Sequence, residues 1–530
     1  MARVAQPVCR LDTDGGPDRA GAPPRAHRDR WGPRGDPRSC RSGPDRRERP
    51  RRPGAGWSDD RHVRARPRCR VGRRPITGDD VVFTHMAIMS LEEPTTFDRA
   101  PYEAIVEIAG SADRVSITFD RPSPAHETIF PVVLPSHQME DTDFAEDWND
   151  EPWMSAGPFR VGWLEFDEFV FVPNEGYPGE GPNLDRLVFR YVPEAAELVD
   201  AFGRGEVDLI LPGPDPDAVR RFGGAEGVDV AVQGGVIWEH LTFQFGDRNR
   251  NPGSLNAELD FRRAVAAALD VDALVDGLWL SDEAFTGLLD IAGLSSDEPR
   301  SGREPDLDEA RALLDSLCER LGRDCVEDPP VVVVSSTSNG EARPVISQRI
   351  AEQLVEAGIE VRLELEDSAF FFGETLHGGT FDLGLWAWAT VPGRTSLLAT
   401  LEIYDPARPL LARDDGATVG GNYGRWGTGA VTGQSLVERP PSGGVDINQG
   451  PSSVIDEHTA RYAEILAELR ATADRSRFDE LAREAEAILA DQVVLIPLAA
   501  RGHVSIVRGI AGYTPTPWVD TWNVEEWRVS

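Results

Sequence analysis

The stretch NLDRLVFRYVPEAAELVDAFGRGEVDLIL (residues 183–211) indicates the fold class of this 530-residue chain. Its first ten residues read as a strand, because apolar and polar side chains largely alternate. A short helical segment follows and ends at Gly205, and EVDLIL (206–211) has the composition of a buried strand. Strand, helix and strand within about 30 residues form a βαβ unit, which predicts a parallel sheet with a right-handed crossover.

Segments on the C-terminal side of this stretch alternate between helix and strand in the same way. A helix from Asp306 is followed by the strand VVVV (331–334), a second helix and the strand FDLGLWAW (381–388). Two amphipathic helices near the C-terminus precede the buried strand VVLIPL (493–498). The pattern predicts an α/β protein with two lobes. Apolar helix faces are predicted at Phe261, Ala264, Val265, Ala268 and Leu269, at Ile346, Ile350 and Leu354, and at Tyr462, Ile465, Leu466 and Leu469.

On the N-terminal side, the same globular pattern begins at Pro75. TGDD (77–80) is a capping box, in which Thr77 caps a helix and Asp80 accepts a hydrogen bond from the Thr77 amide. RVSITFD (114–120) alternates as a strand. Helix caps and regular strands therefore start within a few residues of Pro75.

Residues 1–73 differ in composition from the rest of the chain. Residues 1–75 carry 21 arginines and 9 acidic residues, and the remainder carries a formal charge of −47. Lysine is absent from the whole chain, which suggests a GC-rich genome. Because residues 1–73 are crowded with Pro and Gly and lack an apolar pattern, we expect a wrong-frame or wrong-start translation or a disordered tail. A nucleic-acid-binding arm is the third interpretation.

Charge and motifs argue against several functions for the body of the protein. A strongly acidic surface does not suit nucleic acid, because phosphate binding requires positive charge. No stretch reaches the about 18 apolar residues of a membrane span, and the first 30 residues lack the apolar core of a signal peptide. HExxH, GxSxG and P-loop motifs are absent, and no GxGxxG follows a strand. We therefore expect no catalytic residue, no metal and no cofactor.

Two of the five cysteines lie close together in the globular part of the sequence. Cys318 and Cys325 flank ERLGRD, directly after a predicted helix. A short loop that contains Gly322 could bring them together as a disulfide, which requires an oxidising compartment. Two unpaired thiols are the alternative.

Seven segments, in this order, carry a resemblance to a known family. They are PITGDDVVFT (75–84), VVLPSHQ (132–138), residues 155–210, DFRRAVAAALDVDAL (260–274), ISQRIAEQLVEAGIEVRLEL (346–365), FDLGLWAW (381–388) and AREAEAILADQVVLIPL (482–498). The chain resembles the extracytoplasmic solute-binding proteins of peptide- and nickel-type ABC transporters, family five, also called cluster C. Each segment alone is weak, but together they extend across nearly all of residues 75–530.

The resemblance implies a bilobed periplasmic-binding-protein-like type II fold, in which a hinge joins two α/β lobes. We expect lobe I at residues 74–236, lobe II at 237–499 and a return to lobe I at 500–530. Hinges are expected near Trp238 and near Ala500. Family members carry an export signal, often a lipid-anchored Cys, and several strands before the first matching segment. We therefore expect the true opening of lobe I to be missing from this chain.

The resemblance also implies that the chain is the substrate-binding component of an ABC importer. Such a protein captures oligopeptides or a related small solute between its lobes, closes around it and docks on permease subunits in the membrane. A partner ATPase supplies the energy. We expect an extracytoplasmic monomer, periplasmic or anchored to the membrane as a lipoprotein, with no nucleic acid and no cofactor. A binder of oligosaccharides or another non-peptide solute, and an α/β hydrolase-like enzyme, are the alternatives.

Aromatic side chains are the first candidates to hold the ligand in the cleft between the lobes. GGNYGRWG resembles the family's cleft loop, which points to Asn422, Tyr423 and Trp426. Trp238 and Trp388 lie near predicted element junctions, where aromatic side chains commonly hold a ligand. Packing in the core is the alternative role for each tryptophan.

Charged groups that could hold the ends of a ligand are fewer. Peptide-binding members often have an Asp shortly after the strand that corresponds to FDLGLWAW, where it pairs with the amino terminus of the peptide. Here Thr390 or a neighbour stands in that place, which weakens the case for a free-amine ligand. Arg343 and Arg394 are candidates to bind a carboxylate of the ligand, and an exposed surface position is the alternative for both.

Overall fold

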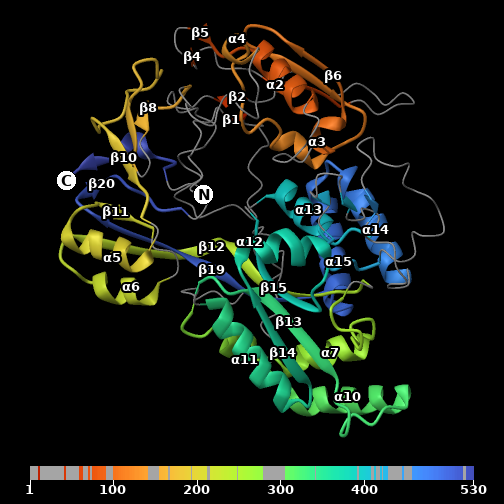
Figure 1. The fold of residues 1–530 in the computed structure, drawn as a ribbon. Helices are drawn as coiled ribbons and strands as arrows, with labels where there is room; N and C mark the ends of the chain where they lie inside the picture. Colours follow the sequence, from red (N-terminus) through yellow and green to blue (C-terminus); the bar gives the residue numbers. More distant parts are fainter. Residues whose placement is uncertain are drawn as a thin grey trace.

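The computed structural model arranges its helices and strands in three bodies, which we call the upper, left and lower bodies after their places in Figure 1. The lower body is the largest and lies at the lower right of the view. The structure describes residues 74–90, 100–140, 154–278, 305–406, 422–427, 456–516 and 521–530, apart from gaps at 165–167, 193, 212–214, 247–248, 341 and 391–392, and short strands at 10–11, 41–42, 59–63, 70–71, 411–412, 418–419 and 445–446.

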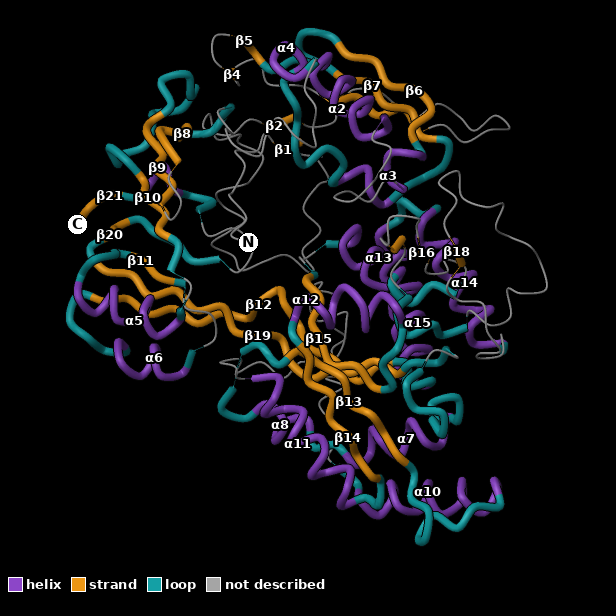
Figure 2. Tube along the Cα trace, viewed as in Figure 1, coloured by secondary structure: helices purple, strands orange, loops and turns teal. Residues whose placement is uncertain are grey.

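A six-stranded sheet runs from the left body into the lower body (Figure 2), in the strand order β11-β19-β12-β15-β13-β14. Its two longest strands, β12 (Val228–Phe243) and β19 (Leu495–Arg508), are antiparallel and pass through both bodies. β13 (Val331–Thr337) pairs in parallel with β14 (Glu360–Glu366) and with β15 (Leu383–Ala389). β13, β14 and β15 therefore form a parallel part of the sheet in the lower body, where strands and helices alternate along the chain, whereas β12 pairs antiparallel with β15.

Within the residues that the structure describes, the lower body packs seven helices against this sheet around one apolar core. The side chains on which the sequence predicts apolar helix faces are all buried, so these faces are confirmed. Asp306 caps α10, because its carboxylate accepts a hydrogen bond from Glu309 N at 2.7 Å. The helices are α7 (Leu259–Ala268), α8 (Val271–Val275), α10 (Leu307–Leu321), α11 (Ala342–Glu356), α13 (Arg394–Glu402), α14 (Glu457–Arg470) and α15 (Arg475–Asp491).

The fully buried carboxylate of Asp382 ties a polar loop to the strands of the lower body. Because a buried carboxylate is costly unless hydrogen-bonded, the chain surrounds it with donors. Its oxygens accept hydrogen bonds from Asn249 Nδ2 (2.6 Å), Asn251 Nδ2 (2.9 Å), Ser254 Oγ (2.7 Å), Asn256 Nδ2 (2.8 Å) and Val333 N (3.0 Å).

The left body corrects the predicted βαβ unit. β8 (Phe159–Leu164), β9 (Glu168–Pro173) and β10 (Leu187–Arg190) form a separate antiparallel sheet. α5 (Ala195–Arg204) follows and ends at the left-handed Gly205, as the sequence predicts. However, β11 (Leu209–Ile210) pairs antiparallel with β19, so the strands on either side of α5 belong to different sheets.

The prediction of a parallel pair at 183–211 is therefore wrong, and each strand shows why. β10 pairs with β9, which shortly precedes it in the chain, and so joins the antiparallel β8–β10 sheet instead of the sheet that contains β11. The partner of β11 comes from the far end of the chain, where Leu209 faces Val507. α6 (Pro216–Phe222) then packs with α5 on a small apolar cluster that includes Phe202 and Phe222.

The upper body contains α2 (Gly78–Ser90) and a three-stranded antiparallel sheet. The predicted capping contact is present, because Thr77 N donates to Asp80 Oδ2 at 2.7 Å. The sheet has the order β3-β7-β6, formed by Asp59–Val63, Val115–Phe119 and Ile105–Gly110. β3 lies within the segment 1–73, so at these five positions the structure forms a paired strand in a segment for which the sequence predicts no order.

Shorter elements complete the described part of the chain. They are β1 (Arg10–Leu11), β2 (Arg41–Ser42), β4 (Arg70–Val71), β5 (Arg74–Pro75), α3 (Ala100–Glu103), η1 (Pro124–Glu127), α4 (Ser136–Met139), α12 (Ser368–Phe370), the π-helical turn η2 (Phe371–Leu376), β16 (Leu411–Ala412), β17 (Thr418–Val419), β18 (Val445–Asp446), β20 (Ile510–Ala511), η4 (Val524–Glu526) and β21 (Arg528–Val529). Within these described residues, no helix is both long enough and apolar enough to cross a membrane.

Candidate functional site

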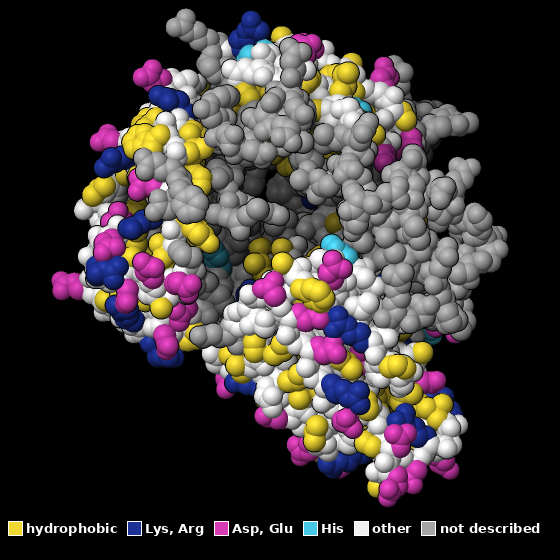
Figure 3. All heavy atoms as spheres, in the orientation of Figure 1, with side chains coloured by type: hydrophobic (Ala, Val, Ile, Leu, Met, Phe, Trp, Pro, Cys, Tyr) yellow, Lys and Arg dark blue, Asp and Glu magenta, His cyan; other side chains and the backbone are white. Residues whose placement is uncertain are grey.

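The site begins at the carboxyl edge of the lower-body strands. β13, β14 and β15 run in one direction, and the helical segments that follow them, α11, α12 and α13, start near their carboxyl ends. Figure 1 places α12 and α13 beside the centre of the molecule, where the three bodies face one another. Figure 3 shows that the molecular surface is hollowed at the centre of this view. In open α/β sheets, ligands commonly bind at this edge.

Four aromatic rings from four chain segments stack at this edge. Trp388 lies 5.8 Å from Tyr423 between ring centroids, with 19° between the ring planes. Tyr423 lies 5.4 Å from His377 at 28°, and Trp388 lies 6.5 Å from His240 at 16°. We call this set the aromatic column. Because His240 is fully buried while the other three rings are partly exposed, the column runs from the core toward the surface.

Trp238 lies next to His240, at the buried end of the aromatic column, with 4.8 Å between the ring centroids. It is fully buried on β12 and is the register partner of Trp388 on β15. Its Nε1 donates to Thr390 Oγ1 at 3.1 Å, and that hydroxyl also contacts Thr400 Oγ1 at 2.8 Å. Trp238 therefore packs in the core, and Thr390 is engaged with its own neighbours.

Asn422 and Trp426 shape the turn that presents Tyr423. Asn422 Oδ1 accepts a hydrogen bond from Trp426 N at 3.1 Å, and Asn422 Nδ2 donates to Trp426 O at 2.9 Å. Both side chains are buried, and the Trp426 ring meets Tyr462 edge-on at 5.3 Å. Of the three residues proposed for this loop, only Tyr423 is more than marginally exposed.

Arg343 lies in the first turn of α11 and is already paired with a carboxylate of the chain. Its Nε and Nη2 donate to the two oxygens of Glu239, each at 3.2 Å, and its Nη1 donates to Thr337 Oγ1 at 3.1 Å. Glu239 is fully buried and also accepts from Arg501 Nε at 2.9 Å and from Arg501 Nη2. One buried carboxylate therefore holds two guanidinium groups, one from α11 and one from β19.

Arg394 lies apart from these groups, in the first turn of α13. It forms a two-nitrogen contact with Asp479 on α15, at 2.9 and 2.7 Å. The next residue, Thr395, contacts Thr128 of the upper body through their hydroxyl groups at 2.7 Å. The structure thus places Arg394 where the lower and upper bodies meet and, among its described contacts, gives it none with the aromatic column.

His240 and Glu239 are neighbours that sequence reasoning missed. Burial, together with the nearby charge of Arg343, lowers the pKa of His240 from about 6.5 to about 3, so the imidazole is neutral. Neither ring nitrogen has a hydrogen-bond partner within the described residues. A signal was present, because an acid and a histidine interrupt the apolar strand VIWEHLTF at residues 236–243.

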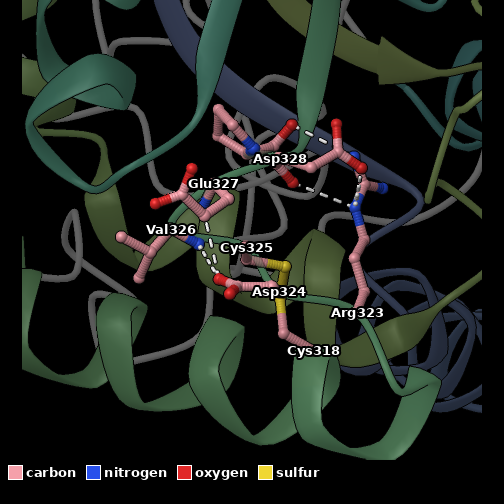
Figure 4. Close-up of a disulfide and its surroundings, with 8 residues drawn as sticks. Cys318, Arg323, Asp324, Cys325, Val326, Glu327 and Asp328 are labelled. Carbon is pink, nitrogen blue, oxygen red and sulfur yellow. Dashed lines mark hydrogen bonds and ion pairs between the residues drawn. A yellow bond between two sulfur atoms is a disulfide. The ribbon is translucent and has the colours of Figure 1, made fainter.

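Cys318 and Cys325, the pair that we expected to be bridged, are joined in a disulfide (Figure 4) with 6.0 Å between their Cα atoms. α10 ends at Gly322 in the left-handed conformation, which turns the chain back so that the two sulfurs meet. In the same loop, Asp324 Oδ1 accepts hydrogen bonds from Val326 N and Glu327 N. The described part of the chain contains no cluster of three His, Cys, Asp or Glu side chains that could hold a metal ion.

Comparison with known proteins identifies relatives of this architecture. The model of the bacterial extracellular solute-binding proteins, family 5 Middle, matches residues 52–399. An Escherichia coli K12 protein described as a probable D,D-dipeptide-binding periplasmic protein is 26% identical over 182 residues, which cover 34% of this chain and 33% of that protein. A Mycobacterium tuberculosis protein described as a probable monoacyl phosphatidylinositol tetramannoside-binding protein is 25% identical over 229 residues, which cover 42% and 33%.

These matches span about a third of the length of the two curated relatives. Solved structures agree over more of the chain. A periplasmic EDTA-binding protein has a TM-score of 0.68 at 19% identity, covering 89% of this chain and 84% of the other. The oligopeptide-binding protein of Bacillus subtilis, in complex with a nonapeptide, has a TM-score of 0.63 at 16% identity, with 89% and 87% covered. At these identities the likeness establishes the fold, which is bilobed and periplasmic-binding-protein-like.

Proposed function

Because the chain belongs to the bacterial extracellular solute-binding proteins of family 5, we propose that it is the substrate-binding component of an ABC importer. It captures a small solute where the three bodies face one another and delivers it to permease subunits in the membrane. One observation carries the site: the partly exposed rings of Trp388 and Tyr423 stack at the carboxyl edge of the lower-body strands. Stacked aromatic faces at such an edge can bury apolar parts of a ligand.

We infer that the solute is an oligopeptide or a related small molecule. Trp388 and Tyr423 contact it directly, whereas Trp238, Asn422 and Trp426 hold these two side chains in place. Arg343 and Arg394 would bind an anionic group of the ligand only while also holding Glu239 and Asp479. Each arginine would therefore be shared between the ligand and a carboxylate of the protein. This sharing favours a ligand group with a partial negative charge, such as a carbonyl oxygen, over a full carboxylate.

A non-peptide solute, such as an oligosaccharide, is the second candidate. It is favoured by Thr390, which stands where a carboxylate would bind a peptide amine and which instead contacts Trp238 and Thr400. The Mycobacterium tuberculosis relative is named for binding a mannoside. An α/β hydrolase-like enzyme has no such support, since the matched proteins are described as binding proteins.

The cellular compartment, oligomeric state and lobe boundaries of the protein belong to the same proposal. The family is extracellular, and the disulfide between Cys318 and Cys325 is suited to an oxidising compartment. We propose a monomer, periplasmic or held at the membrane by a lipid anchor, with no cofactor. Lobe I then comprises residues 74–236 and 500–530, and lobe II comprises residues 237–499.

A thermal-shift screen tests the proposal. The purified full-length protein is mixed with panels of di- to nonapeptides, oligosaccharides and small anions. A ligand at about 100 times its Kd adds about 2.7 kcal/mol to the free energy of unfolding, so a true ligand raises Tm by several degrees. Mass spectrometry should recover the ligand unchanged, because the protein binds without converting it.

Two variants and one control locate the site. Trp388→Ala and Tyr423→Ala should abolish the shift, because each removes one face of the aromatic column. Trp163→Ala is the matched control, since Trp163 is also partly exposed but lies on β8 in the left body. A full shift in both site variants would place the ligand elsewhere.

A further inference from the structure

The pairing of the two strands that cross between the left and lower bodies shifts register at two places. In β12, the stretch from Val228 to Gly234 and the stretch from Trp238 onward are separated by one register shift against β19, and a second shift lies between Glu239 and His240. The first stretch packs on the apolar cluster of the left body, and the second packs on the core of the lower body. The shift between Gly234 and Trp238 therefore lies between two separate cores, where a rotation of one body against the other would occur.

Glycine residues occupy the crossing point on both strands. Gly234 faces Gly502, and at Gly235 an added Cβ would lie 2.0 Å from the carbonyl oxygen of Arg501. Only glycine permits this close approach of the two strands. Segments that absorb large changes in φ and ψ during domain closure are commonly of this kind. We call residues 234–238 and 500–503 the crossing segment.

Glu239 is the first buried charge on the lower-body side of this segment. It is fully buried, and each of its two cationic partners contacts it with two nitrogens. Arg501 belongs to the crossing segment itself, whereas Arg343 belongs to α11 of the lower body. Because a buried carboxylate is very costly without a partner, at least one guanidinium must stay with Glu239 in any arrangement of the bodies.

The two arginines differ in exposure and in the element that carries them. The side chain of Arg343 is 13% exposed, donates to Thr337 and lies over the ring of Phe372 at 5.9 Å. The side chain of Arg501 is 30% exposed and extends from a backbone next to Gly502. Arg501 is thus carried by the crossing segment, whereas Arg343 is carried by a helix of the lower body.

We propose that Glu239 is a hinge latch, which binds Arg501 in the present arrangement of the bodies and releases it when they rotate, while Arg343 keeps the carboxylate paired. With two cations on one carboxylate, the latch can open without stranding a buried charge. Opening then breaks the ion pair between Glu239 and the partly exposed Arg501, while the Arg343 pair persists, so the change is small enough to be reversible. The biological meaning of the latch rests on the proposed capture of a solute, but its test requires no ligand.

Hydrogen exchange of the full-length protein without ligand tests the latch. Arg501→Met should speed amide exchange in residues 234–238 and 500–503 by about fivefold, the factor that corresponds to about 1 kcal/mol for a lost ion pair. Arg501→Lys keeps the charge but not the two-nitrogen contact and should give an intermediate rate. Small-angle scattering should show a larger radius of gyration for Arg501→Met, because more molecules adopt the rotated arrangement.

Arg394→Met is the matched control. Arg394 is 21% exposed and makes a similar two-nitrogen contact with a carboxylate, but away from the crossing segment. It should leave exchange in residues 234–238 and 500–503 at the wild-type rate. Arg343→Met should also leave this exchange slow, because Arg501 still pairs with Glu239.

Two results would overturn the latch. One is wild-type exchange in the crossing segment of Arg501→Met. The other is faster exchange with an unchanged radius of gyration, which would indicate local fraying instead of rotation. Neither result bears on solute capture, and a screen that finds no solute leaves the exchange result standing.

Discussion

The lower body and the left body are built from similar pieces of sequence but are assembled differently. In the lower body, β13, β14 and β15 follow one another with helices between them and pair side by side in parallel. In the left body, strand, helix and strand also alternate, yet β10 and β11 join different sheets. The difference teaches that a local pattern identifies each element, whereas the partner of a strand depends on what the rest of the chain supplies.

The lower body and the left body also differ in how deeply the side chains of their strands are buried. The lower-body strands are covered by helices, and residues such as Val332 and Val334 are fully buried. The separate sheet of the left body leaves Trp163, Val188 and Phe189 more than 40% exposed. Stability in the lower body should therefore depend on side-chain packing much more than stability in the β8–β10 sheet does.

The largest expected effect tests this contrast directly. Ile350→Ala removes a fully buried side chain of α11 and should lower the free energy of unfolding by about 3 kcal/mol. Val188→Ala, at a 42% exposed position of β10, should change it by less than about 0.5 kcal/mol. Urea denaturation followed by circular dichroism measures both. Equal losses would remove the distinction between the two bodies.

The sequence predicted the local features of the fold but not the long-range strand pairing. Helix faces such as Ile346, Ile350 and Leu354, and the cap at Asp306, depend on residues close in sequence and were found where expected. The pairing of Leu209 with Val507 joins positions about 300 residues apart, and no local pattern encodes it.

The candidate site shows the same limit. A pattern can mark aromatic residues such as Trp388 and Tyr423, and these two are stacked in the structure. A pattern cannot show that Glu239 and Asp479 already occupy Arg343 and Arg394, because each pair forms across more than 80 residues. Nor does it separate the buried Trp238 from the partly exposed Trp388, which are neighbours on adjacent strands.

The second prediction compares the polar centres of two bodies. Asp382→Ala leaves several buried donors of the lower body without an acceptor and should cost about 2 kcal/mol. Asp80→Ala, in the upper body, removes the contacts to Thr77 N and Ser136 N at a helix start and should cost about 1 kcal/mol. Thermal unfolding of both variants gives the ratio. A larger loss for Asp80→Ala would reverse the proposed order of the two centres.

The smallest effect concerns pH at the two ends of the aromatic column. The pKa of His240 is lowered to about 3 in the folded chain. Between about pH 6.5 and pH 3, His240 is therefore protonated in the unfolded chain but neutral in the folded chain. Stability contributed by His240 is thus complete above pH 6.5 and falls by about 1.4 kcal/mol per pH unit as the pH drops toward 3.

Because His240→Phe lacks this titration, the difference between wild-type and variant stabilities at pH 6, 5 and 4 should show this slope. His377→Phe is the control at the exposed end, where partial burial also lowers the pKa of the histidine but less strongly, and its slope should be smaller. Identical slopes for the two variants would mean that the two ends of the column do not differ in solvation.

Isothermal titration calorimetry with the strongest hit from the thermal-shift screen tests the central claim most directly. We predict saturable binding of one solute per wild-type chain, loss of that binding in Trp388→Ala and its retention in Trp163→Ala. Wild-type heats in Trp388→Ala would contradict the account, because they would show that the solute binds away from the aromatic column.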